Sequence, residues 1–233
     1  MADLELRKKA AELAAQFWDK AVSDEEIILQ IKEEPELIHA VCLSGANLFL
    51  EAVWKSRFPA AQALREMGAD IHWTCKASAF NGNALNVAHT PQQADQLLEW
   101  GVEIERNLSL LVSKPFKNPA IMAAFHNDTT MLLYWLKKQE ELFSDEPEYV
   151  GEIFYAAIDV VSMMNQYNML ACVIADEQLF DILREIYSRE DNTKSIRLSL
   201  SALRQISDAS LEPRKKELRK ILNARKKELS SAT

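Results

Sequence analysis

The four histidines of this chain, His39, His72, His89 and His126, are the side chains best suited to bind a metal or to act as a general base. His39 and His72 lie 33 residues apart, a separation that several other residue pairs in the sequence share. Equivalent positions of stacked repeats are about 10 Å apart, whereas a zinc ion requires Zn–N distances near 2.1 Å. We therefore expect structural or surface roles for the histidines, no metal site and no cofactor.

Other chemically capable residues have an equally simple structural interpretation. Asp70 and Glu103 follow Gly68 and Gly101 in two similar phrases, which indicates turn residues rather than a catalytic carboxylate pair. The three cysteines share no CxxC spacing, and no GxSxG, HExxH, P-loop or GxGxxG motif occurs. We expect no catalytic residues and no enzyme activity. A small enzyme built on the C-terminal helices is a remote alternative.

Composition limits the fold and the partners. The chain has 233 residues, only five glycines and seven prolines, which favours an all-α protein over a turn-rich β protein. The net charge of −8 argues against general binding to nucleic acid or to an anionic membrane, and no small-molecule substrate is indicated. No signal peptide or membrane-spanning stretch is evident, so we expect a cytoplasmic protein. The oligomeric state is left open.

The sequence contains a repeat. The phrases "PELIHAV" at 35–41, "GADIHWT" at 68–74 and "GVEIERN" at 101–107 succeed each other at 33-residue intervals. A second pattern, an asparagine leading into a short alanine-containing helix, begins at Asn47, Asn83 and Asn118. Each unit is predicted to contain a turn, a short helix, a loop and a longer helix, with Gly68 providing the positive φ that ends one such helix.

These units resemble ankyrin repeats over about residues 24–142. "GAD" at 68–70 is literally present, Asn118 and Pro119 match the Thr-Pro of that family, and Ala123 and Ala124 match its alanine pair. The sequence also departs from the family. The threonine place is always asparagine, the hairpin containing "HWTCKASAFNG" is about three residues longer, and Gln139 stands where the last reversal would have glycine.

The resemblance implies a helical-repeat solenoid in three parts. We expect an N-terminal capping helix at 1–23, ankyrin-like repeats at 24–146 and a C-terminal helical region at 147–233 that stacks on the repeats. Ser23 and Glu26 form a capping-box pattern. The last helix, about 211–230, is basic. It is predicted either to dock through leucines as a cap or to recognise an acidic partner, an anionic membrane or nucleic acid.

The resemblance further implies a protein–protein interaction module that binds through short inner helices and hairpins. Carried over by position, the partner-binding residues are Trp54, Lys55, Phe125 and His126 on inner helices, with Trp73 and Phe80 on the long hairpin. Large aromatic side chains at exposed positions are typical of binding hot spots, but degenerate repeats can also bury them. The alternative function is a bacterial or viral inhibitor, effector or immunity-type protein that sterically blocks a toxin or enzyme, which the acidic charge suggests is basic.

Overall fold

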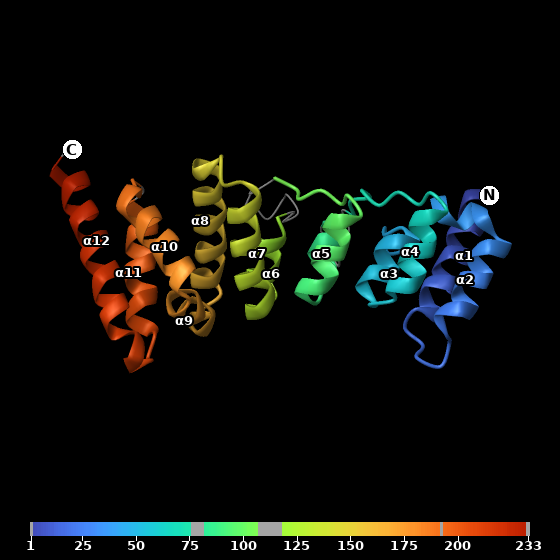
Figure 1. Cartoon of the computed structure of the whole chain (residues 1–233), viewed down its shortest axis with the longest axis horizontal. Helices are drawn as coiled ribbons and strands as arrows, with labels where there is room; N and C mark the ends of the chain where they lie inside the picture. Colours follow the sequence, from blue (N-terminus) through green and yellow to red (C-terminus); the bar gives the residue numbers. More distant parts are fainter. Residues whose placement is uncertain (1, 76–81, 107–117, 192, 232–233) are drawn as a thin grey trace. The chain divides into compact units, whose positions relative to one another are not determined.

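The computed structural model describes residues 2–75, 82–106, 118–191 and 193–231, and these are all-helical (Figure 1). They form twelve α-helices and three 3₁₀-helices, with two isolated β-bridges and no strand in these ranges. Contacts divide the chain into two units, Met1–Asn118 and Pro119–Thr233, and each is described by itself.

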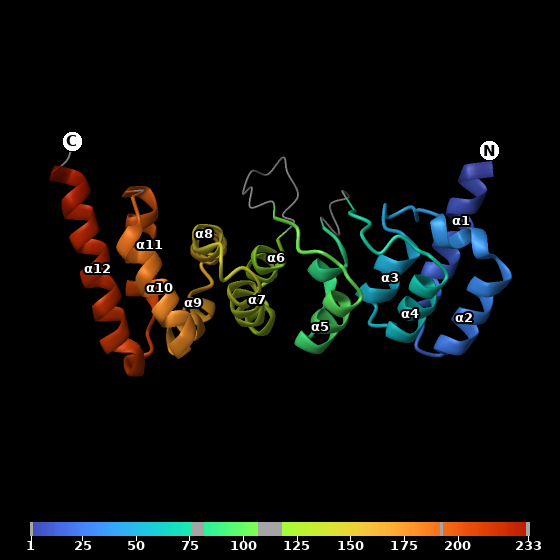
Figure 2. The same ribbon diagram turned by 45° about the horizontal axis from the view of Figure 1, so that its top comes forward.

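Unit 1 is a two-layered stack of helices. Its elements are α1 (Ala2–Gln16), α2 (Asp24–Glu33), η1 (Pro35–His39), α3 (Leu48–Trp54), α4 (Phe58–Glu66), η2 (Ala84–Val87) and α5 (Pro91–Glu99). In one layer α3 packs between α1 and η2, and in the other α2 packs on α4. Trp100, at the end of α5, reaches the rings of Phe49 and Phe58, so α5 joins the stack through an aromatic side chain. Figure 2 shows the α1–α2 pair beside α3 and α4.

The start of unit 1 follows its sequence pattern. The spacing of Leu6, Ala10, Leu13, Ala14 and Phe17 predicts one apolar helical face, and all are buried except Leu6, which is half-buried. The helix ends at Gln16, earlier than expected, and a turn follows. The predicted capping box is confirmed, since Ser23 caps α2 and the Glu26 side chain accepts from the Ser23 amide.

The recurring asparagines connect successive segments of unit 1. Asn47 caps α3 by accepting from the Leu50 amide at 2.9 Å, and its side-chain amide donates to the Asp70 carbonyl at 2.7 Å. Asn83 repeats both bonds, accepting from the Leu85 amide and donating to the Glu103 carbonyl at 2.8 Å. The asparagine in the threonine place is therefore a cap and a clamp on the following reversal.

Both reversals use glycine as predicted. Gly68 has φ +94° and Gly101 has φ +90°, a conformation that L-residues adopt only with strain. The amides after them, Ala69 and Val102, donate back to Leu64 and Leu97. The two segments share this backbone pattern although one follows α4 and the other α5.

The hairpins begin at buried cysteines 33 residues apart. The Cys42 amide pairs with the Ala46 carbonyl four residues on, and the Cys75 amide with the Gly82 carbonyl seven residues on. The three-residue difference matches the predicted lengthening. Each thiol donates to the preceding hairpin or helix, Cys42 to Ala10 and Cys75 to Ser44. Burial raises the pKa of the Cys42 thiol to about 12, which suits an inert packing residue.

The second repeat, which begins at Asn83, deviates from the short helix expected there. The segment after Asn83 is the four-residue 3₁₀-helix η2, and Thr90 caps α5 directly after it. His89, which lies between them, places Nε2 2.8 Å from the Trp54 carbonyl at the end of α3. The short connection between η2 and α5 thus places His89 at the C-terminus of α3.

Unit 2 is also a layered array. Its elements are α6 (Pro119–Phe125), α7 (Thr129–Leu142), α8 (Pro147–Met163), α9 (Tyr167–Ala175), α10 (Glu177–Arg189), α11 (Thr193–Gln205), η3 (Ala209–Leu211) and α12 (Glu212–Ser231). Helix α8 packs between α6 and α11, while α10 packs against α9 and α12. Figure 1 shows α12 lying along α11.

The apolar stretch 152–176 predicts one or two buried helices, and 177–189 predicts an amphipathic helix. The apolar stretch 152–176 contributes to two helices, α8 and α9, and 177–189 is α10. One expectation was wrong, because Gln139 is buried within α7 and the chain reverses only after Leu142. The helix continues since Trp135, Leu136 and Gln139 share its buried face.

One turn recurs in both units. Ser56 (φ 57°), Asn127 (φ 58°) and Asn165 (φ 57°) each follow the first helix of a hairpin, α3, α6 or α8. The next amide donates to the carbonyl five residues earlier at 2.9 Å, as in Arg57 to Ala52. By this geometry Trp54, Phe125 and Met163 occupy one equivalent position, and Lys55, His126 and Met164 the next.

Candidate interaction surfaces

The predicted residues Trp54 and Lys55 lie in an aromatic cluster at the end of α3. The Trp54 ring meets that of Trp18 edge to face, with centroids 5.2 Å apart. The Lys55 ammonium lies 2.9 Å from the Trp18 centroid and 3.3 Å from that of Trp54. Trp18 is 60% exposed. A rigid aromatic pair that holds a cation at the surface is the type of feature that forms binding hot spots.

The charge of Lys55 interacts with that of Glu51 on the same helix. Glu51 is buried one turn earlier in α3 and accepts from Ser44 Oγ at 2.7 Å. Burial raises the pKa of the Glu51 carboxyl, against the opposing effects of Ser44 and Lys55. Burial also lowers the pKa of Lys55, while Glu51 acts in the opposite direction. Desolvation thus exceeds the attraction between the two groups for both partners.

The equivalent turns of unit 2 also expose large apolar side chains. Phe125 is 40% exposed and meets the His126 ring edge to face at 5.5 Å. Met163 is 56% exposed and Met164 46% exposed. Each unit thus has its own set of such residues, which we call its helix-end row: Trp18, Trp54 and Lys55 in unit 1, and Phe125, His126, Met163 and Met164 in unit 2.

Trp73 does not belong to the helix-end row of unit 1. Its indole N–H donates to the Gly45 carbonyl at 3.0 Å, and the side chain is half-buried. Gly45 precedes the N-terminus of α3, whereas Trp54 ends it, and seven helical residues extend about 10 Å. The structure therefore separates Trp73 from Trp54 and gives Trp73 a role in joining two hairpins. Phe80, the other hairpin residue, lies outside the described residues.

The histidines do not converge. His39, His72, His89 and His126 are all exposed, and no group of three or more His, Cys, Asp or Glu side chains in the described ranges is arranged to hold a metal ion. Among the helices described here, none has both the length and the apolar character needed to cross a bilayer.

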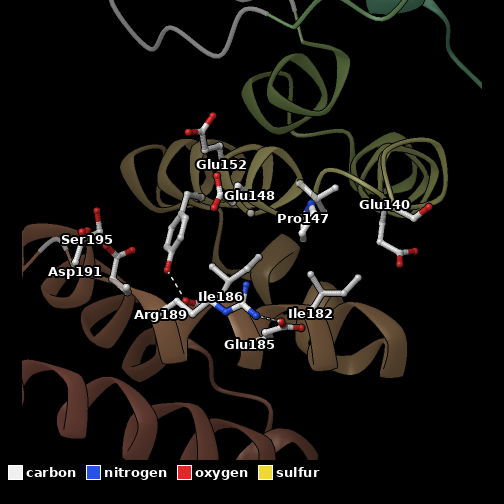
Figure 3. Close-up of a pocket in the computed structure, with 15 residues that line it drawn as sticks. Glu140, Pro147, Glu148, Glu152, Ile182, Glu185, Ile186, Arg189, Asp191 and Ser195 are labelled. Atoms are coloured by element: carbon white, nitrogen blue, oxygen red, sulfur yellow. Dashed lines mark hydrogen bonds and ion pairs between the residues drawn. The ribbon is translucent and has the colours of Figure 1, made fainter.

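A groove in unit 2 is the second surface of interest (Figure 3). It encloses about 730 Å³ between the end of α7, the first half of α8 and the second half of α10. Its apolar lining comprises Pro147, Val150, Ile182 and Ile186. The Tyr155 hydroxyl donates to the Ile186 carbonyl at 2.8 Å, which joins α8 to α10 within the groove.

Acidic side chains dominate the polar lining of this groove. These are Glu140, Glu148, Glu152, Glu185, Glu190 and Asp191, and Arg189 is the one base among the described residues that line it. Arg189 pairs with Glu185, and Glu140 accepts from Gln178. Glu190 is buried, and burial together with the nearby Glu190 raises the pKa of Asp159 on α8. We name this surface the acidic groove.

Sequence reasoning missed three members of the helix-end rows and the whole groove. Trp18 was detectable, because it lies off the apolar face formed by Ala10, Leu13 and Phe17. Met163 and Met164 precede Asn165 just as Phe125 and His126 precede Asn127, a match hidden by the change from an alanine pair to Val161 and Ser162. The groove joins residues from four helices, α7, α8, α10 and α11, and has no linear motif.

No protein-family model matches the sequence. Neither the curated proteins nor the solved structures yield a significant match.

Proposed function

We propose that this chain is a non-catalytic, ankyrin-like helical-repeat protein whose units each contact a partner protein through their helix-end row. The main support is the equivalence of Trp54, Phe125 and Met163, each a large apolar residue at the same position of a recurring turn. Phe125 and Met163 are exposed, while Trp54 is half-buried against the exposed Trp18, and exposed apolar side chains of this kind are typical of interfaces. The repeated asparagine clamps and glycine reversals support the ankyrin-like architecture.

The binding mechanism is steric and preorganised. Trp54 and Lys55 are held by Trp18, so little side-chain entropy is lost when a partner covers them. The methionines of unit 2 adapt their shape to the opposing surface, since the thioether chain is flexible and polarisable. The partner would be recognised by aromatic and methionine contacts, with Lys55 fixing the position of an acceptor.

A Trp54→Ala, Phe125→Ala double variant tests this function. Affinity capture from the native cell extract, quantified by mass spectrometry, should recover a partner with the parent chain and lose it with the variant. The matched control is Leu29→Ala, Leu142→Ala, which removes two other exposed apolar side chains outside the rows. A folded double variant that retains full affinity for the captured partner contradicts the proposal.

A steric inhibitor of a basic toxin or enzyme is the second candidate. The acidic groove favours it, because a surface with excess carboxylates attracts and orients a basic target.

A further inference from the structure

The acidic groove has features that the helix-end rows lack, and they indicate the chemistry of an occupant. Its charge is part of a wider segregation within unit 2. Residues 129–191, which contain α7 to α10, hold thirteen Asp and Glu against two Lys and two Arg, a net charge of −9. The rest of the unit after 192 is basic, with α12 carrying most of the Lys and Arg. A cationic ligand would therefore be drawn to the α7–α10 side of the unit.

The groove combines this charge with an apolar floor. Val150 and Ile186 line it and are buried, Ile182 is half-buried, and Tyr155 also lines it. Figure 3 shows Ile182 and Ile186 together on α10. Glu148, Glu152, Glu185 and Asp191 are exposed around these residues. An apolar floor beside carboxylates fits the two parts of a Lys or Arg side chain, whose aliphatic stem packs while its charged end remains near water.

The charges at Glu190 and Asp159 also favour a cationic occupant. Glu190 is 6% exposed at the groove. Burial raises the pKa of Asp159 on α8, the charge of Glu190 adds to this rise, and Lys194 opposes it. An added cation favours the ionised form of such a carboxyl. The guanidinium of Arg189 is directed to Glu185, which leaves the lining with a large excess of negative charge.

We infer that the acidic groove is a docking site for a basic segment of a partner protein, whose Lys or Arg stems lie on Ile182 and Ile186 and whose charged ends pair with Glu148, Glu152 and Asp191. This surface is separate from the helix-end rows, and the inference does not rest on the function proposed for those rows. The groove recognises charge in an elongated segment, whereas the rows recognise apolar shape.

The experiment uses the full chain and a fluorescein-labelled peptide of repeated Lys-Leu-Arg triplets, followed by fluorescence anisotropy. Glu148→Lys, Glu152→Lys should weaken binding about tenfold or more, equal to about 1.4 kcal/mol. The matched control is Glu25→Lys, Glu36→Lys, which makes the same charge change at exposed sites of unit 1 and should retain near-parent affinity. Ile182→Ala should weaken binding severalfold without changing the charge.

Three outcomes would overturn the inference. The first is a control that weakens binding as much as the groove variant, which would show attraction to net charge alone. The second is a milder Glu148→Gln, Glu152→Gln variant that keeps its circular dichroism spectrum and binds the peptide like the parent. The third is a salt-sensitive dimer in sedimentation that groove variants abolish, which would assign the groove to α12 of a second copy.

Discussion

The side-chain amide of Asn47 donates a 2.7 Å hydrogen bond to the backbone carbonyl of Asp70, and Asn83 makes the same bond to Glu103. Each asparagine also caps the segment that follows it. One buried side chain thus ties the beginning of a helix to the reversal that follows the next helix along the chain. A threonine hydroxyl in the same place has fewer hydrogen-bonding groups than the amide, which accounts for the recurrence of asparagine.

Asn47→Ala should therefore destabilise unit 1. The substitution removes a cap and leaves the Asp70 carbonyl without its bond, for a combined loss of about 2–3 kcal/mol. Urea unfolding followed by tryptophan fluorescence should report it, because Trp18, Trp54, Trp73 and Trp100 all lie in unit 1. Asn168→Ala is the control, since Asn168 is exposed on α9 and its replacement should change stability by less than about 0.5 kcal/mol. Equal effects of the two substitutions would refute the clamp.

Gly68→Ala should cost about 1 kcal/mol. An added Cβ meets no atom within 4 Å, so the cost comes from the positive φ of +94° rather than from a clash. Gly151→Ala is the matched comparison, because Gly151 lies within α8 and its Cβ would only touch Ile186 at 4.0 Å. That change should stabilise the helix by about 0.5–1 kcal/mol. In thermal unfolding, the melting temperature should therefore fall for Gly68→Ala and rise for Gly151→Ala relative to the parent.

Local features of the backbone are the part of this fold that the sequence predicts. A positive φ, a capping side chain and a buried helical face are local, so Gly68, Ser23 and the face of α1 were identified from spacing alone. The hairpin difference at Cys75 was also predictable, since it needed only the distance between two repeated phrases. The packing of Trp73 against Gly45 was not, because it depends on where a neighbouring hairpin places its carbonyl. The groove depends likewise on how α7, α8 and α10 pack.

Glu51→Gln should change how stability depends on pH. The folded-state pKa of Glu51 is raised, mainly by burial, so the native protein binds this proton more tightly than the unfolded chain. That contribution is present below the unfolded pKa of Glu and is lost as pH rises through the folded value. Glutamine retains an oxygen that can accept from Ser44, without the buried charge.

The measurement is the free energy of unfolding of both proteins across the acidic range up to pH 8. The variant should approach the parent at low pH and become relatively more stable as Glu51 ionises in the parent. A difference that is constant with pH would show that ionisation of Glu51 does not matter. Ser44→Ala adds a control, because loss of this bond removes one of the effects that favour the charged carboxylate.

Arg214→Ala should destabilise unit 2, which would show that α12 is a structural cap. Arg214 Nη1 donates to the Ile174 and Ala175 carbonyls at 2.7 Å each, at the C-terminal end of α9, and its guanidinium lies 4.9 Å from the Phe180 ring. Leu218 and Leu222 are fully buried on the same helix. Charge-assisted bonds of this kind contribute about 1.5–3 kcal/mol, so the variant should lose about that much. Lys216→Ala, two residues along and exposed, should lose less than about 0.5 kcal/mol. Differential scanning calorimetry of the two variants distinguishes a docked cap from a solvated recognition helix, because a recognition helix would tolerate both substitutions equally.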